Sequence, residues 1–274
     1  LGAPSAFTRL AQAAPGGPDL YYVFCYFSGG WDTLLGLDPR DPAMFNAENM
    51  RETRIQPAYE LLVGSDGQLV RRGDMVFGPY IGDLANHTDK LAVIRGMSME
   101  TLSHEAGRRR FITGKPPSGQ LARGSSVATH LAAKMGRDDA IPNLALRVET
   151  YNVDEPNYAT GLKANGVPDL LRALRPTQPT LPGGQDAQID QLLKTVARCD
   201  HAQASSKWQA AEDARVKARD MVQGNLAGLF DFRSPANAAL RDRFNIPNSI
   251  AGLNSSGAQA AMAARAVMGG VSRV

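Results

Sequence analysis

The order of apolar runs and helical patterns constrains the fold of this 274-residue chain more than any other feature. Continuous apolar and aromatic runs, typical of strands buried on both faces, lie at 20–27, 91–97 and 141–150. Patterns typical of helices lie between them, at 78–90, 103–113 and 125–136. This alternation predicts an α/β fold with a mostly parallel sheet flanked by helices.

The character of the chain changes near residue 182. Residues 18–181 carry the alternating pattern, whereas amphipathic and Ala-rich stretches predict a helical lobe or insertion at 182–274. Residues 1–17 are rich in small side chains, and Ala-Gln-Ala at 11–13 resembles a signal-peptidase site. We interpret this stretch as a signal-peptide remnant or a flexible tail. Because a new element begins as the sequence stops, we expect the chain to be a fragment that ends before the remaining strands.

Charge, hydropathy and cysteine content exclude several classes of protein. Thirty basic residues against 27 acidic ones give a net charge of +3, too small an excess to indicate a nucleic-acid partner. No apolar run reaches the roughly 18 residues of a membrane-spanning helix. Cys25 and Cys199 form neither a disulfide framework nor a zinc motif. Since Cys25 lies within an apolar run, we expect a buried free thiol.

The segment LSHEAGRRRFITGKPP, at 102–117, predicts a short helix with both ends marked. Ser103 is a favourable N-cap residue, and Glu105 suits the positive end of the helix dipole. Gly114, followed by a lysine and two prolines, is a typical C-terminal stop. Successive helical residues differ by about 100°, so the arginines at 108–110 point in three directions instead of forming one basic patch.

Two of these arginines receive separate roles. Arg109 lies four residues after Glu105, the favourable spacing for a helix ion pair. Arg108 lies four residues after His104 and shares its helix face. A helix N-terminus offers free N–H groups, and a guanidinium binds oxyanions through two hydrogen bonds. We therefore predict that Arg108 contacts a small phosphate or sulfate group.

Asp32 is the candidate metal ligand. It follows a Gly-Gly turn after the run at 20–27, and α/β proteins build their sites where parallel strands end. If the runs at 20–27 and 91–97 are parallel, Asp32 and the helix start at His104 share one edge of the sheet. A cation held by Asp32 would then face an anion held by Arg108. The alternative is that Asp32 only caps its turn.

These residues resemble the nucleophile region of the alkaline phosphatase and sulfatase superfamily. There, the nucleophile opens a helix, an Arg follows four residues later, and Thr-Gly follows five and six residues beyond the Arg. His104 and Arg108 keep the first spacing. Thr113 and Gly114 keep the second. The metal-binding Asp after the first strand of that superfamily corresponds to Asp32.

A narrower resemblance is to the domain-of-unknown-function 1501 family, whose members are typically bacterial and exported through the twin-arginine route. It is carried by FSGGWDTLLGLDPRDP, RGMSMETLSHEAGRRRFITGKPP and IPNLALRVETYNVDEPNYATGL. This resemblance agrees with the signal-like first residues. It implies an alkaline phosphatase-like fold and a periplasmic or secreted location.

The resemblance implies a metal-dependent hydrolase of phosphate or sulfate esters. Asp32 would help to bind a divalent cation (Ca²⁺, Zn²⁺ or Mg²⁺), and Arg108 would hold a small anionic ester or a sulfated or phosphorylated glycan. His104 stands where the family has Cys, Ser or Thr, with Ser103 one residue earlier, so either residue is placed at the attack point. A histidine there is a nucleophile, a metal ligand or a sign that ester hydrolysis has been lost. The alternative function is a non-catalytic exported protein of this fold that binds an anionic glycan or a surface partner.

For two further features, a structural role is weighed against a functional one. His130 lies in the predicted helix at 125–136, and packing or solvation explains it better than metal binding. The stretch ETYNVDEPNYATG at 149–161 either lines the site or forms a turn.

Overall fold

In the computed structural model, the described residues are 20–119, 121–175 and 184–274. They form a mixed α/β structure in two compact units. One unit is Cys25–Met99, and the other combines Glu100–Val274 with residues 20–24. The predictions for residues 1–17 fall outside the described residues.

The Cys25–Met99 unit consists of loops around a small hairpin. Strands β1 (Val70–Arg72) and β2 (Met75–Phe77) pair antiparallel, and the 3₁₀ helix η2 (Gly82–Lys90) confirms the helix predicted at 78–90. Phe77 and Ile81 are buried in the core of this unit. Two short helices complete the unit: α2 (Met50–Thr53) and η1 (Tyr59–Leu61).

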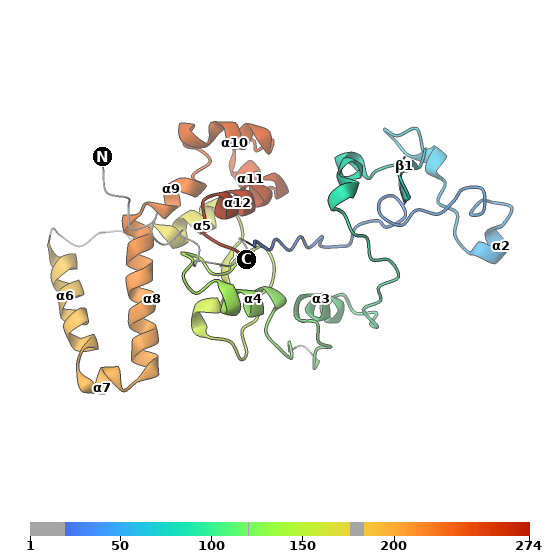
Figure 1. Ribbon diagram of the computed structural model, residues 1–274. Helices are drawn as coiled ribbons and strands as arrows, with labels where there is room; N and C mark the ends of the chain where they lie inside the picture. The colour runs from blue at the N-terminus through green and yellow to red at the C-terminus, as the bar shows by residue number, and fades with distance from the viewer. Residues whose placement is uncertain (1–19, 120, 176–183) are drawn as a thin grey trace. The chain divides into compact units, whose positions relative to one another are not determined.

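The larger unit is mainly helical, and the helices predicted at 103–113, 125–136 and beyond 182 are confirmed. Its elements in chain order are α3 (His104–Thr113), α4 (Val127–Met135), β3 (Leu144–Leu146), η3 (Asn157–Ala159), β4 (Leu162–Ala164), α5 (Val167–Leu174), α6 (Gln185–Ala197), α7 (Asp200–Gln203), α8 (Ser206–Gln223), α9 (Leu226–Phe230), η4 (Pro235–Asn237), α10 (Ala238–Arg243), α11 (Ile250–Leu253) and α12 (Ser256–Met268). Helices α6 and α8 lie side by side, joined through α7 (Figure 1).

The sheet of the larger unit is small. Strands β3 and β4 pair in parallel. The N–H groups of Ile141 and Leu144 donate to the carbonyls of Val271 and Val274, at 2.9 and 3.0 Å. Residue numbers rise together along both segments, so the segment 271–274 runs parallel to the segment that leads into β3. The mixed α/β class is therefore confirmed, with one strand of the three predicted formed at the expected place.

The other two strand predictions, for residues 20–27 and 91–97, are wrong. Both runs lie in the part of the chain that the structure describes. Neither run forms a strand there, although the Tyr22 N–H donates to the Arg273 carbonyl at 2.8 Å. Aromatic and β-branched side chains favour an extended backbone, but a strand also needs a neighbouring backbone to pair with. Because the run at 20–27 is not covered by neighbours, Cys25 is an exposed free thiol and not a buried one.

In the larger unit, one apolar core joins helices from both sides of the boundary predicted near residue 182. Leu170 from α5 packs in the same cluster as Phe230, Met262 and Val271, all fully buried. Burial of this kind contributes roughly 1.5–3 kcal/mol for each large side chain. Over the residues that the structure describes, no helix combines the length and apolarity needed to cross a membrane.

Candidate functional site

Helix α3 begins as the sequence predicts. Ser103 is its N-cap residue, in an extended conformation, and its Oγ accepts a hydrogen bond from the Ala106 N–H at 3.4 Å. Gly114 ends the helix in the left-handed conformation at φ 69°, where a side chain would be strained. Ser103 and His104 are both exposed. The predicted attack point is therefore accessible to a ligand.

Arg108 forms an ion pair that the sequence did not predict. Its Nη2 lies 2.9 Å from Oε1 of Glu149, which follows β3 in the chain. Each side chain is about one-third exposed (32% and 31%), so the pair is partly shielded from water. The Nε of Arg108 is buried and has no hydrogen-bond partner among the described residues. This arginine is therefore held against the loop after β3.

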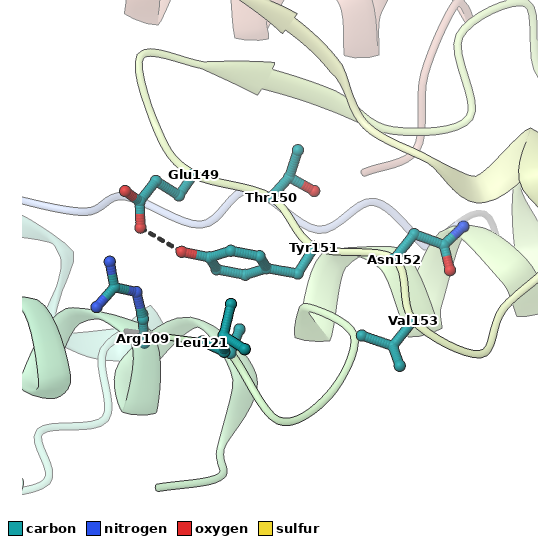
Figure 2. A pocket seen from close by; sticks show the side chains of 8 residues that line it. Arg109, Leu121, Glu149, Thr150, Tyr151, Asn152 and Val153 are labelled. Carbon is teal, nitrogen blue, oxygen red and sulfur yellow. Dashed lines mark hydrogen bonds between the residues drawn. The ribbon is translucent and has the colours of Figure 1, made fainter. Parts of the chain in front are cut away.

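A cavity of about 510 Å³ opens between α3 and that loop. Its lining residues are Arg109, Leu121, Ala122, Glu149, Thr150, Tyr151, Asn152 and Val153. Figure 2 shows Arg109 on one side, facing Glu149 and Tyr151 on the other. The stretch at 149–161 thus lines a cavity with its first residues, one of the two explanations that its sequence left open.

Glu149 links both sides of this site. Its Oε1 faces Arg108, while its Oε2 accepts a hydrogen bond from the Tyr151 hydroxyl (Figure 2). Burial raises the pKa of the Tyr151 phenol, the bond to Glu149 raises it further, and Arg109 opposes both. Arg108 thus pairs with Glu149, while Arg109 lies near the Tyr151 phenol. A guanidinium at a cavity wall can bind a small anion.

Two buried serines fix the backbone of the loop. The Tyr151 N–H donates to Oγ of Ser126 at 2.8 Å, and the Val153 N–H donates to Oγ of Ser125 at 2.9 Å. Both serines lie just before α4 and are at most 2% exposed. The cavity wall is therefore hydrogen-bonded to the start of a helix.

Asp32 lies in the Cys25–Met99 unit, whereas Ser103, His104 and Arg108 lie in the other. Its Oδ1 accepts hydrogen bonds from the N–H groups of Leu34 and Leu35, at 3.0 and 3.2 Å. Asp32 thus caps its turn, which is the second of the two roles that the sequence allowed.

A second polar cluster lies in the larger unit. His130, Asp154 and Glu155 bring their potential ligand atoms within 4.8 Å of one another. It is the one group of three or more such side chains found among the described residues. Because His130 lies 24 residues from Asp154, spacing along the chain gave no metal motif to detect.

The structure also changes which arginine lines the cavity. The sequence assigned the anion to Arg108 and an ion pair to Arg109, whereas Arg108 contacts Glu149 and Arg109 lines the cavity. Helical spacing gives the direction of each side chain but does not show which loop lies opposite. Glu149 and Tyr151 were missed as site residues for the same reason.

The chain was compared with known proteins. No family model matches it, and no curated protein or solved structure shows significant similarity.

Proposed function

We propose that this chain is part of an exported, metal-dependent hydrolase of phosphate or sulfate esters, of the alkaline phosphatase type. The proposal rests on two features of helix α3. Its first residues, Ser103 and His104, are exposed, and two arginines follow about one turn later. Arg109 lines the cavity and Arg108 is fixed by Glu149. A guanidinium group suits the anionic group of such an ester.

The proposal includes the larger parallel sheet of that fold. Two features support it: the parallel pairing of β3 with β4, and the parallel course of segment 271–274 beside the segment leading into β3. In both pairs the two segments run in the same direction, so their C-terminal ends lie at the same edge. α/β proteins build their sites at such an edge.

In the proposed reaction, Ser103 Oγ or a His104 ring nitrogen forms a bond to the phosphorus or sulfur atom. The bond from that atom to the ester oxygen breaks, and the leaving oxygen takes a proton from water; where Ser103 is the nucleophile, its hydroxyl proton passes to the hydroxide so formed and restores that water. A second water molecule then hydrolyses the covalent intermediate, which releases phosphate or sulfate and restores the side chain. The N–H groups at the start of α3, together with Arg108 on the helix face of His104, stabilise the anionic oxygens.

The proposed metal at Asp32 has little support from the residues around it. Asp32 offers one carboxylate, whose Oδ1 already accepts two N–H groups. A cation of the kind proposed needs three or more protein ligands. We therefore assign no catalytic step to a cation at Asp32, and test its role by substitution.

The decisive experiment is hydrolysis of an aryl phosphate and an aryl sulfate by the purified protein, with and without added Ca²⁺, Zn²⁺ or Mg²⁺. Ser103→Asn keeps a good N-cap but removes the hydroxyl, whereas Ser103→Ala removes both. If Ser103 is the nucleophile, both variants lose more than about 99% of the activity. If His104 is, His104→Asn loses it and the Ser103 variants keep it. Full activity in all three variants would refute the attack point, and full activity in Asp32→Ala would refute the metal role.

The second candidate function is binding of an anionic glycan without hydrolysis. It is favoured by His104 at the position where the resembled family has a hydroxyl or thiol nucleophile, and by Ser103 Oγ acting as a cap acceptor. A protein of this kind binds sulfated or phosphorylated oligosaccharides but releases no sulfate or phosphate. Binding by calorimetry together with no turnover over days would select this function over the first.

A further inference from the structure

His130, Asp154 and Glu155 form a compact cluster of metal-ligating side chains outside the cavity. His130 is on α4, and the two carboxylates are adjacent in the loop that continues from the cavity wall. The Nδ1 of His130 lies 2.6 Å from Oε1 of Glu155. Their side chains are 41% and 21% exposed, so the cluster is partly shielded yet reachable from solvent. An imidazole beside two carboxylates distinguishes this set from an ordinary acidic patch.

The two carboxylates are positioned by groups that are not themselves ligands. Ser125 is fully buried, and its hydroxyl donates to Oδ1 of Asp154 at 2.6 Å. The Glu155 N–H donates to Oδ1 of Asn152 at 3.0 Å, which fixes the backbone at the second carboxylate. Supporting hydrogen bonds of this kind orient metal ligands and limit the entropy lost on binding.

The distances suit one small cation. Two donors that each lie about 2.1 Å from an ion are at most about 4.2 Å apart, and about 3.3 Å apart at a tetrahedral angle. All three ligand atoms already lie within 4.8 Å of one another. His130 and Glu155 must separate, by less than about 1 Å relative to their present contact, and ligand atoms near the 4.8 Å limit must approach one another by a similar amount. These are side-chain adjustments that leave the backbone in place.

The charges of the cluster also favour a divalent cation. Asp154 and Glu155 carry two negative charges, and His130, followed by Lys115, acts on Asp154 as an opposing positive charge. With a neutral imidazole, one negative charge remains in excess. Imidazole with carboxylate ligands suits Zn²⁺ and Mn²⁺, whereas Ca²⁺ and Mg²⁺ prefer oxygen ligands alone.

We propose that His130, Asp154 and Glu155 bind one divalent cation of the zinc or manganese class, with water in the remaining position. Three protein ligands and one exchangeable position are the arrangement of reactive zinc sites, in contrast to closed structural ones. The inference rests on these contacts alone and does not depend on ester hydrolysis. It concerns a site separate from the one predicted at Asp32.

The test is titration of the chelator-treated protein with ZnCl₂, followed by isothermal calorimetry. We expect one tight site in the unaltered protein, and loss of affinity by more than about tenfold in His130→Gln and in Glu155→Gln. The matched controls are His201→Gln and His87→Gln, which replace two of the other three histidines and should leave the tight site unchanged.

Three outcomes would overturn the proposal: no stoichiometric zinc site, unchanged affinity in both ligand variants, or tighter binding of Ca²⁺ than of Zn²⁺. Far-UV circular dichroism checks that each variant is folded. If His130→Gln does not fold, Glu155→Gln and Asp154→Asn decide the question, since both keep the size and hydrogen bonding of the original side chain. Zinc binding by a protein with no esterase activity would support this site while refuting the proposed reaction.

Discussion

Glu149 accepts hydrogen bonds from Arg108 and Tyr151 on its two carboxylate oxygens, with Arg108 Nη2 at 2.9 Å from Oε1. This one side chain joins helix α3 to the loop after β3, 41 residues apart in the chain. It also lines the cavity, on the side opposite Arg109.

Glu149→Gln should have opposite effects on stability and on anion affinity. Loss of a partly shielded ion pair lowers the free energy of unfolding by about 1 kcal/mol. Loss of a negative charge beside Arg109 raises affinity for inorganic sulfate or phosphate by roughly three- to tenfold. Urea unfolding and calorimetry measure the two effects. Glu52→Gln, at an exposed position of α2, is the matched control, and an unchanged anion affinity in Glu149→Gln would contradict the assignment of the cavity.

Arg109→Met should weaken sulfate or phosphate binding by about tenfold, because the cavity loses the guanidinium that lines it. Arg110→Met is the comparison on the same helix, since Arg110 pairs with Glu100 at 2.7 Å and does not line the cavity. We expect that variant to bind the anion normally in calorimetry. Equal losses in the two variants would mean that the anion responds to total charge and not to the cavity.

Ser125→Ala should detach the loop from α4. The buried hydroxyl bonds to Asp154 and to the Val153 N–H, and its removal leaves those groups without their partner. We expect a loss of about 1–3 kcal/mol in the free energy of unfolding and weaker zinc binding. Ser118→Ala, at an exposed position, should change neither quantity. Wild-type stability in Ser125→Ala would show that the loop is fixed by other contacts.

Asp190 should make the helical hairpin of α6 and α8 sensitive to acid. Its carboxylate contacts Arg215, Lys194 and Arg219, with 3.0 Å to the lysine Nζ. The hydrogen bond from Arg215, followed by that from Lys194, holds the pKa of Asp190 well below its usual range. The folded state then binds fewer protons than the unfolded state below about pH 5, so this stabilisation is present at neutral pH and declines as the pH falls through about 4.

Thermal melts between pH 7 and pH 3 measure this effect. Asp190→Asn should melt at a lower temperature at pH 7 and lose less on acidification than the unaltered protein. Asp186→Asn, in the first turn of α6, serves as the control and should follow the unaltered curve. Parallel curves for Asp190→Asn and the unaltered protein would rule out Asp190 as the acid-sensitive group.

The sequence by itself determined the local structure around the candidate site. Ser103 and Gly114 mark the ends of α3, because capping hydrogen bonds and a left-handed residue act within a few positions of the chain. The same holds for α4, whose predicted span agrees with the structure. Interactions of this range can be read from neighbouring residues without knowledge of the fold.

Only the tertiary structure decided the partners of these elements. The run at 20–27 has the composition of a buried strand, yet pairing depends on a distant backbone, and no strand forms there among the described residues. Arg108 pairs with Glu149, and Arg109 lines the cavity, because the loop after β3 lies opposite this part of α3. His130 gained two carboxylate neighbours from a loop 24 residues away. Such contacts bring together residues distant in the chain, so they depend on packing and not on local sequence.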